Sequence, residues 1–177
     1  PGGYLYMNDL LGNPQFMKKI GRLIASAYAD KEISVIMTMA TKGIPIAYAV
    51  ASYLNVPVVI VRRDNKVTEG PTVSINYISG SSKRIQTMLL SKRSLEVGSR
   101  VLIVDDFMKA GGAIHGMTSL LEEFDAVVSG IAVLIESEET EDRLVEEYLS
   151  VLRLSPVDEK KKKIHVKKGN YFNKKGE

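Results

Sequence analysis

Two adjacent carboxylates followed by a pair of glycines are the residues best suited to chemistry in this sequence. Asp105 and Asp106 come directly after the apolar run 101–104, and Gly111 and Gly112 follow shortly afterwards. Glycine permits backbone conformations that expose several N–H groups together, and such groups at a helix N-terminus bind phosphate. Carboxylates repel phosphate but accept hydrogen bonds from hydroxyls. The spacing therefore predicts a site for a sugar phosphate with neighbouring hydroxyl groups.

A second candidate phosphate site follows the apolar segment 33–39. It offers a hydroxyl, a cation and a glycine before a helix that starts near Pro45. Its members are Ala40, Thr41, Lys42 and Gly43. Taken alone, such a stretch is more often an ordinary strand–helix turn, and paired acids after a strand are often only a helix cap. The two stretches together favour anion binding.

Basic side chains are concentrated between residues 62 and 93, where seven of them face only two acids. The residues that could reach over an anionic ligand are Arg62, Arg63, Lys66, Lys83 and Arg84. Breaks at Gly70 and Gly80 suit a mobile cover over a site. The alternative is a basic hairpin that is simply solvated.

The elements that must position these residues alternate between strands and helices. Apolar patterns predict helices over 15–28, 44–54, 113–124 and 144–149, the last of them acidic. Strands are predicted over 33–39, 56–61, 100–104 and 127–135, with weaker candidates at 151–154 and 164–166. Segments 72–78 and 85–90 read as an inserted antiparallel flap. The pattern predicts an α/β fold with a central parallel sheet, helices on both faces, and ligands at the carboxyl ends of the strands.

Composition excludes several classes of protein. The chain has 177 residues, 45% of them hydrophobic and 25% charged, as in an ordinary globular domain. It has no cysteine and two histidines, which disfavours disulfides and resident metal sites. Neither a membrane-spanning run of about 20 apolar residues nor a signal peptide is evident, so we expect a cytoplasmic protein. The run Lys160–Lys163 reads as a solvated surface, with nucleic-acid binding as the alternative.

Residues 101–113 resemble the phosphoribosyl pyrophosphate (PRPP) motif of type I phosphoribosyltransferases. The resemblance implies that family's fold and ligand, with Asp105 and Asp106 on the ribose hydroxyls. It implies that residues 40–43 receive the pyrophosphate, and that Mg²⁺ comes with the ligand rather than from a cofactor site of the protein. The loop that would wrap the 5′-phosphate consists of Phe107, Met108, Lys109, Ala110, Gly111, Gly112 and Ala113.

The loop departs from the usual family pattern at three positions. Ala110 stands where most members have a hydroxyl residue, and Ala113 where Thr is common. Lys109 takes the place of an Asp that serves proton transfer in hypoxanthine–guanine enzymes, and a cationic lysine is a poor base at neutral pH. Lys109 and Ala110 disfavour catalysis, whereas Ala113 does not, because xanthine-type members tolerate Ala there. The phosphate must rely on backbone N–H groups and Lys109.

Several further segments resemble the purine operon repressors of Gram-positive bacteria, namely residues 1–6, 39–45, 59–70, 74–77 and 105–112. The resemblance implies that residues 1–177 form a PRPP-sensing domain without transferase activity, in which PRPP binding relieves the repression of purine synthesis genes. It also implies a homodimer and an N-terminal winged-helix domain that binds operator DNA, and no such domain is evident in this sequence. The basic residues 62–93 could add electrostatic attraction for the DNA backbone, for which PRPP would compete. An active adenine- or xanthine-type transferase is the alternative, and a purely structural domain is a weaker one.

Overall fold

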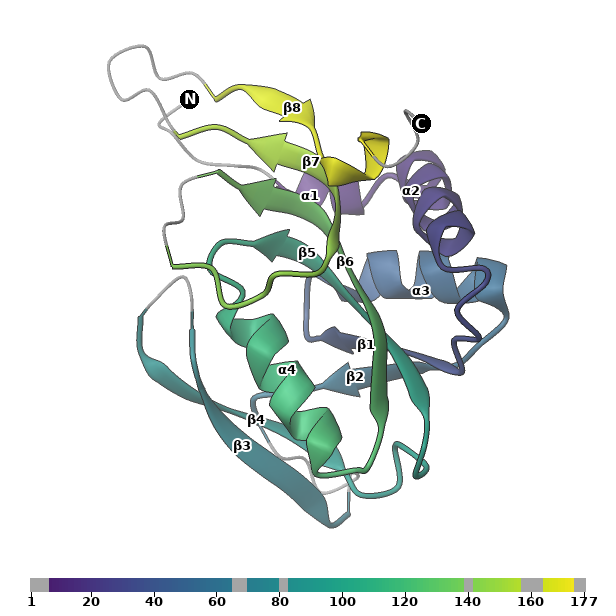
Figure 1. Cartoon of the computed structure of the whole chain (residues 1–177), viewed down its shortest axis with the longest axis vertical. Helices are drawn as coiled ribbons and strands as arrows, with labels where there is room; N and C mark the ends of the chain where they lie inside the picture. Colours follow the sequence, from purple (N-terminus) through teal and green to yellow (C-terminus); the bar gives the residue numbers. More distant parts are fainter. Residues whose placement is uncertain (1–6, 65–69, 80–82, 139–141, 157–163, 174–177) are drawn as a thin grey trace.

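A six-stranded sheet forms the centre of the structure (Figure 1). The structure is a computed structural model, and it describes residues 7–64, 70–79, 83–138, 142–156 and 164–173. In spatial order the strands are β2 (Val58–Val61), β1 (Val35–Met39), β5 (Arg100–Met108), β6 (Val127–Ser137), β7 (Leu149–Leu154) and β8 (Val166–Lys168). Neighbours pair in parallel from β2 to β7, whereas β8 runs antiparallel to β7.

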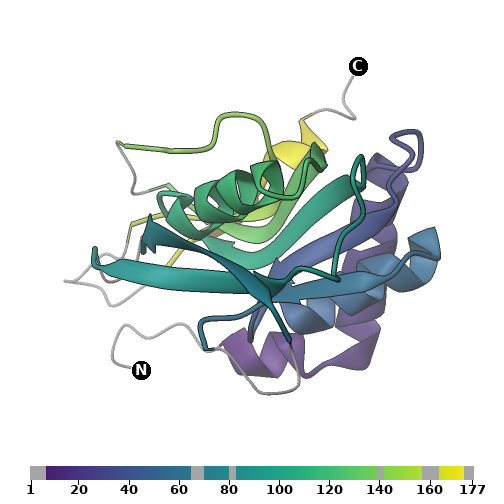
Figure 2. The same cartoon turned by 90° about the horizontal axis from the view of Figure 1, so that it is seen from below.

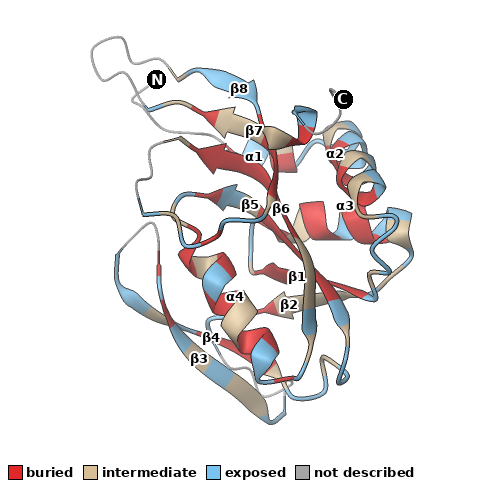
Figure 3. Cartoon of the chain, in the orientation of Figure 1, coloured by how far each residue is buried: buried red, intermediate tan, exposed pale blue. Residues whose placement is uncertain are grey.

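The central strands are buried on both faces, as continuous apolar runs in a parallel sheet require (Figure 3). Successive side chains alternate between two cores because strand side chains point to opposite faces. Ile36 and Leu102 lie in one apolar cluster, while Met37 and Ile103 lie in the other. One sheet thus contributes to two hydrophobic cores, one on each of its faces.

Helices cover both faces of the sheet (Figures 1 and 2). Helices α1 (Met7–Leu11), α2 (Pro14–Ala27) and α3 (Ile44–Leu54) pack on one face, and α4 (Gly112–Glu122) packs on the other. The side chain of Asn13 caps α2 by accepting the Phe16 N–H at 2.9 Å. Pro45 lies in the first turn of α3, where its missing N–H has no intrahelical partner to lose.

The inserted flap is an antiparallel hairpin of β3 (Thr72–Ile78) and β4 (Ile85–Ser91). Its inner residues Tyr77, Met88 and Leu90 are buried in the same cluster as α4. Gly116 of α4 permits this close approach, because a Cβ there would lie 2.6 Å from Met88 Cε and 2.9 Å from Tyr77 Cβ. The described part of the flap is therefore anchored to α4.

The predicted α/β class, the parallel sheet and the inserted flap are confirmed, whereas the end of one strand and one whole helix were predicted wrongly. Strand β5 does not end before the aspartates but continues to Met108, because β6 goes on pairing with it as far as Glu136. The predicted helix 144–149 does not form: residues 142–148 are not helical, and Leu149 begins β7. Helix α1 and a short 3-10 helix, Asn170–Phe172, were not predicted. No helix within the described ranges has the length and apolar character needed to cross a membrane.

Candidate functional site

The two predicted phosphate loops meet at the carboxyl edge of the sheet. One follows β1 and the other ends β5, and these two strands are parallel neighbours. Between the loops lies a cavity of about 480 Å³. Of the residues predicted to form the site, it is lined by Ala40, Thr41, Lys42, Arg63 and all nine residues from Asp105 to Ala113. The order of the strands reverses here, which is where open α/β sheets bind their ligands.

The loop after β5 has the geometry of an anion site. Gly111 is the N-cap of α4 and has a φ of +84°, a conformation that favours glycine. The first N–H groups of α4 have no intrahelical acceptor and form the positive end of the helix dipole. Met108 is buried, whereas Phe107 and Lys109 are exposed at the cavity. The loop is thus able to take a phosphate group on backbone N–H groups.

The two aspartates differ in environment. Asp105 is only 8% exposed and accepts the Asp106 N–H at 2.9 Å, whereas Asp106 is half-buried. Burial raises the pKa of the Asp105 carboxyl well above its ordinary value, and the negative charge of Asp106 raises it further. Backbone hydrogen bonding and Arg63 act in the opposite direction. In the ligand-free protein, negative charge on Asp105 is therefore unfavourable. A hydrogen-bond donor from a ligand would stabilise it.

We expect ligand-free Asp105→Asn to be more stable than the wild type at neutral pH. Because folding raises the pKa of Asp105, its contribution to stability is fully present only below the ordinary value of 3.8 and is lost as the pH rises through the raised value. The amide carries no charge, so its advantage should grow with pH and vanish towards acid. Urea unfolding between about pH 4.5 and 8 measures the difference. The exposed Asp30→Asn is the control, and a gain that does not depend on pH would contradict the assignment.

The loop after β1 is held close to Asp105 by a glycine. The Ala40 N–H donates to Val61 O at 2.9 Å, and the Ala40–Thr41 peptide is cis. Gly43 is buried and does not itself line the cavity, although the sequence placed it in the loop. A Cβ at Gly43 would overlap Thr38 Oγ1 and lie 3.1 Å from Asp105 Oδ1. Its role in this geometry is to let the two loops approach each other.

The basic flap contributes less to the cavity than the sequence suggested. Of its predicted basic residues, Arg63 lines the cavity, Arg62 pairs with Leu89 beside the hairpin, and Lys83 and Arg84 are exposed near its tip. Lys66 lies outside the described residues.

Two lining residues of the flap, Tyr77 and Ser79, were missed. The Tyr77 hydroxyl donates to Gln86 Oε1 at 2.8 Å and lies 3.8 Å from Met39 Sδ. The alternation of Val73, Ile75 and Tyr77 along β3 was the signal that could have placed Tyr77 on the inner face.

Comparison with known proteins agrees with this geometry. The sequence matches the phosphoribosyl transferase domain family over residues 7–167. It is 64% identical over 172 residues to the purine biosynthesis transcriptional repressor PurR of Bacillus subtilis (strain 168), covering 97% of this chain and 60% of that protein. It is 54% identical over 175 residues to the purine biosynthesis transcriptional activator PurR of Lactococcus lactis subsp. lactis (strain IL1403), covering 99% of this chain and 65% of that protein.

The chain thus spans less than two thirds of the length of these two relatives. The fold is also that of an adenine phosphoribosyltransferase from Thermoanaerobacter pseudethanolicus ATCC 33223, with a TM-score of 0.76 and 22% identity over 85% of this chain and 87% of that one. At that identity the likeness concerns the fold alone. With a match that spans both loops, the sheet and the flap, the chain belongs to the phosphoribosyl transferase domain family.

Proposed function

We propose that this chain is the effector-binding domain of a transcriptional regulator of purine biosynthesis, and that its effector is PRPP. The cavity carries the proposal, because it sets adjacent carboxylates for hydroxyls beside backbone N–H groups for phosphate. The names of the relatives support the regulatory role. One relative is a repressor and another an activator; we favour a repressor released by PRPP, since the repressor shares 64% identity with the chain.

In this proposal, each part of PRPP meets one part of the cavity. The ribose hydroxyls donate to Asp105 and Asp106, residues 107–113 take the 5′-phosphate, and residues 40–43 take the pyrophosphate. Arg63 adds a cation at the rim. Mg²⁺ accompanies the pyrophosphate, because it keeps several waters and binds through one or two carboxylates plus ligand phosphates. Within the described part of the chain, no three His, Cys, Asp or Glu side chains are grouped to hold a metal ion by themselves.

The same cavity is poorly equipped for phosphoribosyl transfer. Among its described lining residues, Asp105 and Asp106 are the only carboxylates, and both are engaged by the ribose in this proposal. Lys109 and Ala110 supply neither a general base nor a side-chain hydroxyl to the loop. Removing a single preorganised donor lowers catalysis by a factor on the order of 10²–10³. Catalytic transfer is therefore not part of the proposed function.

We expect calorimetry to show saturable binding of PRPP with Mg²⁺, and no pyrophosphate release when adenine, guanine, hypoxanthine or xanthine is added. ATP with Mg²⁺ is the control for unspecific attraction of polyphosphates to the basic residues. Equal affinity for ATP and PRPP would contradict the ribose assignment. Pyrophosphate release at rates normal for purine phosphoribosyltransferases would show that the chain is an active transferase and would contradict the proposed sensor function.

DNA and a second copy of the chain are the further partners in this proposal. Operator DNA is bound by the whole regulator, of which this chain spans about 60% in the Bacillus subtilis relative. PRPP lowers the affinity for operator DNA by the factor by which it binds the DNA-free form more tightly than the DNA-bound form. By reciprocity, DNA must lower the affinity for PRPP by the same factor. The homodimer is proposed only from the resemblance to the purine operon repressors.

A further inference from the structure

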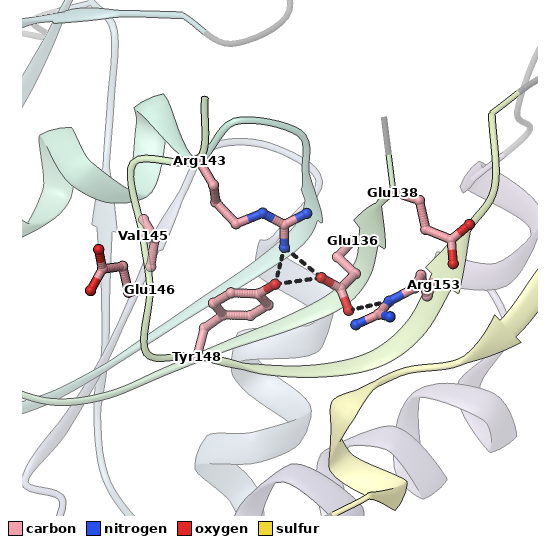
Figure 4. A pocket seen from close by; sticks show the side chains of 7 residues that line it. All are labelled: Glu136, Glu138, Arg143, Val145, Glu146, Tyr148 and Arg153. Atoms are coloured by element: carbon pink, nitrogen blue, oxygen red, sulfur yellow. Dashed lines mark hydrogen bonds and ion pairs between the residues drawn. The ribbon is translucent and has the colours of Figure 1, made fainter. Parts of the chain in front are cut away.

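Glu136 is a buried carboxylate that the proposed PRPP site does not use. It is 1% exposed and stands at the carboxyl end of β6, next to Met108 of β5. Figure 4 shows the side chains of Arg143 and Tyr148 reaching it from one side and that of Arg153 from the other. A charge in such a position is tolerated only when it is paired and fully hydrogen-bonded.

Both oxygens of Glu136 are occupied. Oε1 accepts from Ser150 Oγ at 2.7 Å and from Arg153 Nε at 2.9 Å. Oε2 accepts from Arg143 Nη1 at 2.6 Å and from the Tyr148 hydroxyl, and these two donors also contact each other. The carboxylate thus ties Arg143 and Tyr148, five positions apart, to one point. This explains why the intervening acidic segment is not a helix.

The segment between these two anchors touches the 5′-phosphate loop. The Leu144 N–H donates to Ala110 O at 2.9 Å. The side chain of Val145 is buried beside Gly111, where a Cβ would lie only 2.8 Å from Val145 Cγ2. Arg143 Nη2 also donates to Ser137 O at 2.8 Å, which fixes the start of the segment to β6.

Residues 142–148 belong to no helix or strand, so this segment is held by the contacts of Arg143 and Tyr148 to Glu136 and by the backbone hydrogen bond from Leu144 to the loop. Without Glu136, Arg143 and Tyr148 would lose their common acceptor, and Leu144 and Val145 would no longer be fixed against the loop. Ala110 and Gly111 would then lose a hydrogen bond and a packing neighbour. The loop after β1 would keep its own contacts to Val61 and Thr38.

We propose that Glu136 is a positioning residue for the 5′-phosphate loop, acting through Arg143, Tyr148 and the segment between them. This inference rests on the proposed function, in which that loop holds the phosphate of a ribose 5-phosphate group. It predicts a selective defect: ligands that carry the 5′-phosphate lose affinity, whereas pyrophosphate, received by the opposite loop, does not.

The test measures the affinities of PRPP, ribose 5-phosphate and pyrophosphate for the wild type and Glu136→Gln. We expect the variant to bind PRPP and ribose 5-phosphate at least tenfold more weakly, and pyrophosphate within about twofold of the wild type; tenfold corresponds to about 1.4 kcal/mol. Amide hydrogen exchange should be faster at Leu144 and Gly111 but unchanged in β1. The matched control is Glu146→Gln, since Glu146 lines the surface pocket that also contains Glu136, Arg143 and Tyr148 (Figure 4) but is itself exposed.

The outcomes separate this inference from the proposed function. A wild type that binds no PRPP overturns both. A wild type that binds PRPP, with a Glu136→Gln variant that binds all three ligands equally well or loses all three alike, overturns the positioning role alone. If Glu136→Gln does not fold, Tyr148→Phe removes one donor and keeps the charges, with Tyr53→Phe as its control. Unchanged ribose 5-phosphate affinity in folded Tyr148→Phe would then reject the inference.

Discussion

Asp105→Ala should bind PRPP at least tenfold more weakly than the wild type. A hydrogen bond to a charged acceptor contributes about 1.5–3 kcal/mol, and about 1.4 kcal/mol corresponds to a factor of ten in affinity. The buried Asp105 lines the cavity, and Asp106 is the only other carboxylate among the described lining residues. Calorimetry with PRPP and Mg²⁺ gives the ratio of the two affinities directly.

We expect this loss without unfolding, because removal of the Asp105 charge relieves desolvation and repulsion in the ligand-free protein. The melting temperature of the variant should therefore be no lower than that of the wild type, while PRPP should raise it less. Asp30→Ala, on an exposed turn, is the matched control. Full PRPP affinity in a folded Asp105→Ala variant would show that Asp105 does not bind PRPP.

Gly111→Ala should reduce PRPP affinity by at least tenfold and lower stability as well. With a φ of +84°, an alanine at this position adopts the left-handed region at a cost of roughly 1–2 kcal/mol. Its Cβ would also press on Val145 Cγ2 from 2.8 Å. The loop must then move, and with it the N–H groups that are proposed to hold the 5′-phosphate. Urea unfolding and calorimetry measure the two effects.

The chain offers a close control for backbone strain. Gly98 has a φ of +77° and no atom within 4 Å of the Cβ that an alanine would add. It lies in the turn before β5, at the opposite end of that strand from the cavity. Gly98→Ala should lose the part of the stability that comes from backbone strain but keep its affinity for PRPP. If both variants lost affinity alike, the defect would be one of global stability rather than of the loop.

Much of the fold could be predicted because its patterns are local. The buried strands are continuous runs of apolar, largely β-branched residues, and the helices α2 and α3 carry a cap at Asn13 and a first-turn proline at Pro45. The juxtaposition of the two loops could be predicted as well, because loops at the carboxyl ends of neighbouring parallel strands share one edge. Their chemical roles remain predictions.

The features that could not be predicted depend on contacts between residues that are distant in the chain. The acidic run near Glu146 has helical character, but the acceptor at Glu136 captures Arg143 and Tyr148 and overrides it. The end of β5 depended on how far β6 continues, which no local pattern reports. The basic residues of the flap were assigned to the site because many of them occur close together in the sequence. Which residues reach the cavity depends instead on the register of the hairpin, so Tyr77 lines the cavity and Arg84 does not.

The pairing of β1 with β5 also has a consequence for biosynthesis. The loops that form the cavity, represented by Thr41 and Asp106, are separated by about 65 residues, so one is synthesised well before the other. At ~5–20 residues per second, that delay is roughly 3–13 s. A nascent chain that ends before Asp105 lacks the whole second loop and cannot yet hold a ligand between the two loops. Stabilisation by ligand therefore begins only after translation has passed the second loop.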